Sequence, residues 1–400
     1  MYADLTLIAA FTLVYAIVAG RLEKGKLSGP IIFVAFGVLV GPAGLDLLGL
    51  VLDGESLKFL AELTLAVVLF ADAAGSNLTV LKRILGLPAR LLLVGLPLTI
   101  LLGFGAAMVL FPQLSLLEAG ILATMLAPTD AALGKAVVSN EAVPEEVREG
   151  LNFESGLNDG ICVPILLVLL ELAGGHGDES AGALALSFAA EELGVGLTVG
   201  LVLALGSAWA IRFARRRDWL SEQWSTVPVV ALGILCFAAA QALGGSGFIA
   251  AFVGGLALGS FMKNEDRKEN LLASAELSGD VLALVTWLCF GAAVVPIALN
   301  HVDPATLGYA ALSLTIARML PVFLSLTGMG LGSMTKLFVG WFGPRGLASV
   351  VFCVLVVDAD LPGGTVLTGV AAWTIIGSVL AHGISASPLA NAYAKRLAGE

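Results

Sequence analysis

Charged residues are scarce in this sequence. Lys, Arg, Asp and Glu make up 13% of its 400 residues, whereas a typical soluble domain carries about 25%. Hydrophobic residues account for 58%, and the mean hydropathy is +0.96. This balance excludes an ordinary soluble protein and predicts an all-α protein that crosses a membrane many times.

Cysteine is also scarce, and its spacing excludes two further classes. The four cysteines lie singly within apolar runs, without the paired spacing of a zinc site or a disulfide framework. No basic segment precedes the first apolar run, so we expect a retained span rather than a cleaved signal peptide. We expect no cofactor, no enzymatic activity and no nucleic-acid partner, and membrane lipids as the surroundings of the chain.

Apolar segments of the length that spans a bilayer as a helix recur along the chain. About 13 can be marked, over residues 3–20, 28–45, 57–75, 87–111, 115–139, 149–173, 182–211, 225–243, 246–262, 279–299, 305–328, 335–357 and 364–390. We number these predicted spans in chain order.

Lys and Arg are distributed unevenly between the connections of these spans. With the N-terminus outside, all of the 21 except Lys58, Arg318 and Arg345 fall in cytoplasmic connections or the C-terminal tail. The cytoplasmic set includes Lys24, Lys26, Lys82, Arg83, Lys263, Arg267 and a cluster from Arg212 to Arg217. By the positive-inside rule, this asymmetry predicts a multi-pass protein of the cell membrane with its N-terminus outside and its C-terminus in the cytoplasm.

Spans 5 and 12 share an interruption. In span 5, Pro128 is followed by Thr129 and Asp130, and in span 12 Pro344 is followed by Arg345. Spans 1–6 and 8–13 correspond at about the offset that separates Pro128 from Pro344. Because span 7 lies between the two sets, the second half enters the membrane from the opposite side. Interrupted helices at corresponding positions of two inverted repeats are typical of the binding site of a secondary transporter.

The predicted organisation follows from this repeat. We expect a first inverted repeat over residues 1–173, a linking span and loops over 174–224, a second repeat over 225–390 and a short cytoplasmic tail over 391–400. Spans 5 and 12 are predicted to be crossed, broken helices.

Few polar side chains fall inside the spans, and a charge at bilayer depth costs roughly 2.5–3.5 kcal/mol, so those present are expected to have partners or ions. Glu154 and Asn158 share one face of a helix, and so do Ser155 and Asp159, because each pair is four residues apart. The full set is Thr129, Asp130, Glu154, Ser155, Asn158, Asp159, Arg318 and Arg345.

Four motifs together resemble the monovalent cation:proton antiporter-1 family, the sodium/proton exchangers. They are Glu154-Ser155-Gly156-Leu157-Asn158-Asp159-Gly160, Pro128-Thr129-Asp130, Gly343-Pro344-Arg345-Gly346 and the arginine of span 11, Arg318. The resemblance covers essentially the whole chain. It implies a homodimer in which a core bundle moves against a dimerisation domain.

The resemblance also implies residue roles. The carboxylate of Asp159 is expected to bind sodium and a proton alternately, with Asp130 and Ser155 near the ion, and Glu154 is expected to pair with Arg318. The chemistry agrees, because sodium prefers oxygen ligands, which Asp159, Asp130, Ser155 and the carbonyl groups near Thr129 can supply. A single carboxylate that holds either ion couples the two fluxes by competition.

Three further residues have expected roles. Asn158, as an asparagine beside Asp159, favours one proton per sodium and hence electroneutral exchange. Arg345 is expected to neutralise the negative helix ends at the crossing. Asp72, at the end of span 3, is either an additional ion ligand in the inner funnel or a solvated helix end. His382 in span 13 is expected to be a hydrogen-bonded packing residue, with tuning of the pH response as the alternative.

The expected function is therefore secondary active exchange of sodium for protons. Potassium or lithium exchange remains an alternative, because all these cations prefer oxygen ligands and selectivity depends on the size of the cavity. A cation channel is a further alternative, although the inverted repeat and the interrupted spans favour alternating access.

Overall fold

The computed structural model describes residues 2–22, 28–48, 54–75, 86–130, 133, 135–138, 140, 142–174, 179–221, 224, 226–262, 268–300 and 302–397. Within these ranges the chain forms helices and irregular connections and contains no strand, so the predicted all-α class is confirmed. Several residues named above lie outside the described ranges, namely Lys24, Lys26, Lys82, Arg83, Lys263, Arg267 and the last three residues of the predicted tail.

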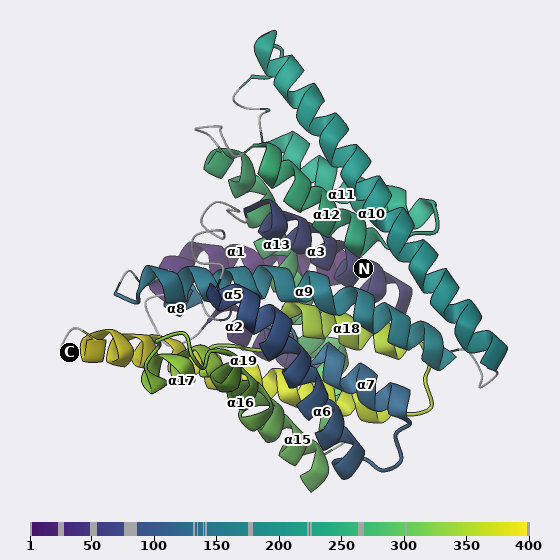
Figure 1. Ribbon diagram of the computed structural model, residues 1–400, viewed down its shortest axis with the longest axis vertical. Helices are drawn as coiled ribbons and strands as arrows, with labels where there is room; N and C mark the ends of the chain where they lie inside the picture. The colour runs from purple at the N-terminus through teal and green to yellow at the C-terminus, as the bar shows by residue number, and fades with distance from the viewer. Residues whose placement is uncertain are drawn as a thin grey trace. The chain divides into compact units, whose positions relative to one another are not determined.

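The helices follow one another along the chain, and Figure 1 labels most of them. Their bounds are α1 Tyr2–Leu22, α2 Gly29–Val40, α3 Gly54–Gly75, α5 Gly86–Arg90, the π-helical η1 Leu91–Gly95, α6 Leu96–Leu110, α7 Leu116–Met125, α8 Lys135–Val138, α9 Glu145–Gly174, α10 Glu179–Arg216, α11 Val227–Ala242, α12 Gly247–Phe261, α13 Lys268–Cys289, the π-helical η3 Phe290–Val294, α14 Val295–Leu299, α15 Pro304–Leu314, α16 Ile316–Ser325, α17 Ser333–Trp341, α18 Leu347–Asp358 and α19 Gly364–Leu397.

Several of these helices are long and apolar enough to cross a membrane. In the described part of the chain seven helical stretches meet this condition, among them α1, α9 and α19. Shorter apolar helices, including α7, α12 and α18, add to them. The chain is thus a multi-pass membrane protein, as its composition predicts.

The helices pack into two compact units, each drawn from separate stretches of the chain. The first comprises residues 1–59, 86–155 and 284–400, and the second comprises residues 60–85 and 156–283. These units are defined by packing, whereas the predicted inverted repeats concern symmetry along the sequence and stay a prediction.

In the first unit, α19 is a central element that packs on α14, α15 and α18, while α6 packs on α7 and α16. An apolar cluster joins η1, α16, α17 and α19 through buried side chains that include Leu91, Val322, Val339 and Tyr393. This cluster stabilises the helices that flank the broken segments.

In the second unit, α10, α11 and α12 pack against one another, and Figure 1 shows them side by side. The glycines of α12 allow backbones to approach closely. A Cβ atom at Gly255 would overlap the carbonyl of Phe70 in α3, and one at Gly259 would overlap that of Ala74. Small residues spaced four apart are a common device for packing helices in membranes.

Two interruptions in the first unit coincide with the prolines of spans 5 and 12. Helix α7 ends at Met125 and the chain is irregular through Asp130, whereas α17 ends at Trp341 and α18 begins only at Leu347. Pro128 and Pro344 lie in these non-helical stretches because proline lacks an N–H and disfavours helical backbone in the residue before it. We call residues 342–346 the crossing segment.

Candidate ion-binding site

The crossing segment meets the end of α7 through Asp130. The backbone N–H of Asp130 donates to the carbonyl oxygen of Pro344 at 2.9 Å, and the carboxylate of Asp130 accepts from the N–H of Leu347 at 3.0 Å. Leu347 is the first residue of α18, so Asp130 satisfies one of the N–H groups that a helix leaves unpaired at its start. The two broken helices are therefore joined by both the backbone and the side chain of Asp130.

Two glycines allow this crossing. A Cβ atom at Gly346 would overlap the carboxylate of Asp130, and one at Gly343 would overlap the guanidinium of Arg318. A larger residue at either position would displace a charged side chain of the site. Glycine at both positions brings the backbone within reach of Asp130 and Arg318.

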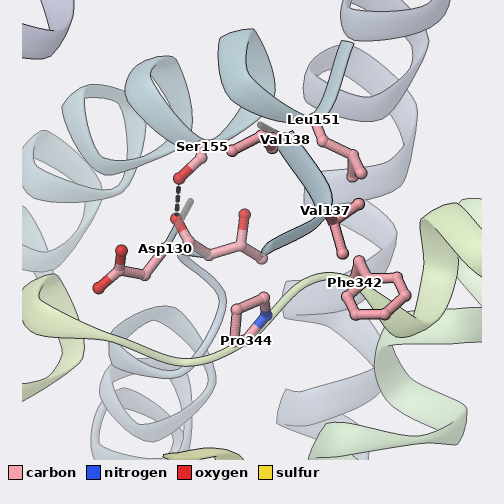
Figure 2. A pocket seen from close by; sticks show the side chains of 8 residues that line it. Asp130, Val137, Val138, Leu151, Ser155, Phe342 and Pro344 are labelled. Atoms are coloured by element: carbon pink, nitrogen blue, oxygen red, sulfur yellow. Dashed lines mark hydrogen bonds between the residues drawn. The ribbon is translucent and has the colours of Figure 1, made fainter. Parts of the chain in front are cut away.

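A pocket lies beside the crossing. The hydroxyl of Ser155 in α9 donates to the carbonyl oxygen of Thr129 at 2.7 Å, and both residues are buried. Thr129, Asp130, Ser155 and Pro344 line the pocket together with apolar side chains from α8, α9 and the crossing segment. In Figure 2 the polar residues lie at one end and Val137, Leu151 and Phe342 lie at the other.

Glu154 and Arg318 lie together next to this site. Arg318 donates through both terminal nitrogens to the two carboxylate oxygens of Glu154, at 2.5 and 2.7 Å. Each side chain is 1% exposed. A two-pronged contact of this kind is among the strongest hydrogen-bonded ion pairs, and it fixes α9 to α16.

Arg345 connects the C-terminal ends of two helices. One terminal nitrogen donates to the carbonyl oxygen of Ala127 at 3.0 Å, and the other donates to that of Ser313 at 3.2 Å. Ala127 follows α7, and Ser313 lies at the end of α15, where helical carbonyls lack partners within the helix. The fully buried guanidinium of Arg345 therefore lies on the negative ends of two helices.

The remaining predicted site residues belong to the second unit. Asn158 and Asp159 are buried in α9, one turn beyond Glu154 and Ser155. Asp72 is exposed in α3 and lies beside α9. A Cβ atom built at Gly156 of α9 would be 3.4 Å from the Cβ atom of Asp72.

Two contacting residues were not singled out from the sequence as parts of the site. The hydroxyl of Ser378 in α19 accepts from the backbone N–H of Arg345 at 2.6 Å. The carboxylate of Glu118 accepts from the N–H groups of Ser115 at 2.9 Å and Gly363 at 2.6 Å, joining the start of α7 to the turn before α19. The Ser115-x-x-Glu118 spacing is a capping-box signal that could have predicted the contact between Ser115 and Glu118.

The polar residues that line the pocket are Thr129, Asp130 and Ser155, whose side chains carry oxygen as their only polar atoms. Such a set suits a hard cation and offers nothing to a metal that prefers nitrogen or sulfur. No group of three or more His, Cys, Asp or Glu side chains that could hold a metal ion occurs among the residues described.

Similar proteins share both the sequence pattern and the fold. The K(+)/H(+) antiporter NhaP2 of Shewanella sp. (strain MR-4) is 26% identical over 381 residues, which cover 95% of this chain and 64% of the relative. The K(+)/H(+) antiporter NhaP of Alkalimonas amylolytica is 26% identical over 97% of this chain and 66% of its own length. The chain thus spans somewhat less than two thirds of the length of these relatives.

A solved structure has the same fold. The sodium proton antiporter MjNhaP1 from Methanocaldococcus jannaschii matches with a TM-score of 0.77 and 22% identity, over 98% of both chains. The family model described as sodium/hydrogen exchanger, transmembrane, matches residues 7–392. The chain therefore belongs to the sodium/hydrogen exchanger family.

Proposed function

We propose that this protein is a secondary active antiporter that exchanges Na⁺ for H⁺ across a membrane. The observation that carries the proposal is the pocket at the crossing of two broken helices, where the Ser155 hydroxyl donates to the Thr129 carbonyl beside Asp130. Broken helices at membrane depth supply backbone oxygens and helix ends to a transported ion. Family membership and the names of the relatives support the same activity.

We assign the exchange itself to Asp159. It lies four residues beyond Ser155 on α9, and residues at this spacing occupy the same face of a helix. Burial favours the neutral form of a carboxyl group, and a bound cation favours its ionised form, so a proton and a cation compete for it. Asp130, Ser155 and Thr129 complete the cation site in this proposal, and Asp72 supplies a further ligand on its path.

The charges around the crossing support a one-for-one exchange. The guanidiniums of Arg318 and Arg345 balance the carboxylates of Glu154 and the partly buried Asp130, and the charge of Asp159 is in excess. One monovalent cation or one proton neutralises it, and the neutral Asn158 beside it adds no second proton site. Exchange is then electroneutral.

Glu154, Arg318, Asn158 and Arg345 have structural and charge-pairing roles in this proposal. The paired Glu154 and Arg318 hold α9 against α16, and Arg345 holds the ends of α7 and α15 together. These contacts keep the crossing in one geometry while the ions exchange.

The proposal includes the arrangement in the membrane. We propose about 13 spans in two inverted repeats, with the N-terminus outside, the C-terminus in the cytoplasm and a homodimer of core and dimerisation domains in the cell membrane. The two breaks support it, since those of α7 and α17 fall at corresponding places in spans 5 and 12.

A K⁺/H⁺ antiporter is the second candidate. It is favoured by one observation, that the Shewanella and Alkalimonas relatives carry that name. Lithium exchange is compatible with the same oxygen ligands. A cation channel is disfavoured, because a carboxylate that holds one ion at a time suits alternating access better than a continuous pore.

The test is cation-driven proton flux in proteoliposomes, with Na⁺, Li⁺ and K⁺ added in turn to the wild type and to Asp159→Asn. We expect saturable proton release in the wild type and none in the variant. The cation that gives the fastest proton release identifies the substrate. Glu171→Gln is the matched control, because Glu171 is an exposed acid of the same helix. Undiminished cation-driven release from Asp159→Asn would refute the proposal.

A further inference from the structure

Three polar residues of α19 hold the two ends of the crossing segment. They are Ser378, His382 and Ser385, whose spacing of four and three residues places them on one helix face. Ser378 accepts from the N–H of Arg345, near the start of α18, at 2.6 Å. His382 Nε2 lies 2.9 Å from the carbonyl oxygen of Trp341, the last residue of α17, and Ser385 accepts from the Trp341 indole N–H at 3.0 Å.

The crossing segment depends on such external contacts. Its five residues form no helical turn, and helical hydrogen bonds hold only its two ends, through the N–H of Phe342 and the carbonyl oxygen of Gly346. Its position in turn determines that of Asp130, which is bonded to Pro344 and to Leu347. A shift of the segment would therefore move a carboxylate of the proposed ion site.

The hydrogen bonds of the His382 ring depend on its protonation state. Its Nδ1 lies 2.9 Å from the carbonyl oxygen of Ser378 and 3.3 Å from the hydroxyl of the same residue. In a neutral ring with its hydrogen on Nε2, Nε2 donates to Trp341 and Nδ1 accepts from the Ser378 hydroxyl, while the contact between Nδ1 and the Ser378 carbonyl oxygen is not a hydrogen bond. In a protonated ring Nδ1 donates to the Ser378 carbonyl instead, and the hydroxyl is released.

The surroundings of this ring are buried and hold fixed charges. His382 is 1% exposed. The ionised groups that act on it among the described residues are the guanidiniums of Arg345 and Arg318, the second of which is paired with Glu154. Helices α2 and α14, which also pack on α19, contain no acidic or basic residue.

The other helices on α19 present ionisable groups with partners of their own. Tyr309 of α15 donates to the carbonyl oxygen of Gly103, and Glu118 of α7 accepts from Gly363. Asp358, at the end of α18, pairs with Lys58 at 2.6 Å, and the side chain of Lys135 in α8 lies outside the described part of the chain.

We propose that His382 is a positioning residue of the exchange site, which sets the crossing segment through Trp341 and Ser378 and changes its contact with Ser378 when its ring is protonated. The inference rests on the proposed function and adds a regulation to it. The Nε2 contact to Trp341 persists in both states, whereas the Ser378 hydroxyl, which also meets the backbone of Arg345, is redirected. The pH therefore acts on the geometry around Asp130 as well as on the exchange carboxylate.

The test compares His382→Phe and His382→Gln in proteoliposomes. Phenylalanine keeps the ring volume but removes both contacts, so we expect the apparent KM for the driving cation to rise about tenfold through misplacement of Asp130. Glutamine can still donate to Trp341 but does not titrate, so its KM should stay within about twofold of the wild type. Ile384→Ala is the matched control, because Ile384 is an exposed residue of the same helix, two positions from His382.

Two readouts separate this inference from the proposed function. At saturating cation, where competition at the carboxylate is suppressed, the wild-type rate should show a titration step that His382→Gln lacks. Hydrogen exchange of the backbone over residues 342–347, which needs no transport, should be about tenfold faster in His382→Phe than in the wild type or Ile384→Ala. An inactive wild type would refute the proposed function alone.

Contrary results would overturn the inference in either of its parts. Unchanged KM and unchanged hydrogen exchange in His382→Phe would show that His382 does not position the segment. Identical pH profiles of the wild type and His382→Gln would show that its protonation is not used.

Discussion

Glu154 and Arg318 form a fully buried pair in which both terminal nitrogens of the arginine donate to the carboxylate, at 2.5 and 2.7 Å. The free energy gained by such a pair is largely offset by the cost of removing both charges from water. Its strongest effect is therefore seen when one partner is lost and the other charge stays buried.

We predict that Glu154→Ala lowers the free energy of unfolding by about 3–5 kcal/mol, because it leaves the guanidinium of Arg318 buried without a counter-charge. The double variant Glu154→Ala with Arg318→Ala should lose less than the sum of the single changes. Denaturant unfolding of the detergent-solubilised protein measures all three, with the exposed Glu171→Ala as control. Additive losses would contradict a direct pairing.

Gly346→Ala should abolish most of the transport. Its new Cβ atom would overlap the carboxylate of Asp130, which must then move from both the N–H of Leu347 and the pocket. Gly308→Ala is a matched control, since a Cβ atom there would meet nothing within 4 Å. Cation-driven proton flux measures the effect, and normal flux in Gly346→Ala would show that the crossing is less constrained than described.

Asp130→Asn separates the capping of α18 by this residue from its role as a negative charge at the cation site. An asparagine oxygen can still accept from Leu347, so the free energy of unfolding should stay within about 1 kcal/mol, whereas Asp130→Ala should lose about 0.5–2 kcal/mol with the cap. The negative charge is lost in both variants. The apparent KM for the cation should therefore rise by about tenfold or more in each, and an unaltered KM in Asp130→Asn would remove this carboxylate from the cation site.

Exchange of one cation for one proton moves no net charge and should be insensitive to voltage. A single uncompensated charge would feel about 2.3 kcal/mol per 100 mV, enough to change a rate up to about 50-fold. In proteoliposomes clamped with potassium and valinomycin, Na⁺-driven rates at 0 and −100 mV should agree within about twofold. Asp159→Asn reports the passive leak, and a steep voltage dependence would contradict the one-for-one stoichiometry.

Much of the architecture was predictable because the bilayer imposes strong constraints on a sequence. The length of the apolar runs predicts many helices, and the prolines at 128 and 344 lie where the structure is not helical. The orientation predicted from Lys and Arg stays a prediction. The pairing of Glu154 with Arg318 was inferred from the family resemblance. In the structure these two residues, which are 164 positions apart, lie in contact.

Other features depend on contacts that spacing alone does not determine. The bond between Asp130 and Leu347 joins residues 217 positions apart, and nothing in the local sequence of either indicates it. Nor does the apolar sequence around Ser313 indicate that α15 ends there and leaves its carbonyl oxygen to Arg345. Of the three polar residues on one face of α19, only His382 was singled out from the sequence, and its partners Trp341 and Ser378 were not.

The central claim is that one carboxylate, Asp159, holds either a cation or a proton. Proton release on cation binding tests it most directly, by titration calorimetry of the detergent-solubilised protein in buffers of different ionisation enthalpy, with the cation that drives the fastest flux. At a pH where the empty site is protonated, we predict about one proton released per cation bound in the wild type and none in Asp159→Asn. Cation binding to the wild type without proton release, or equal release from Asp159→Asn, would contradict the account.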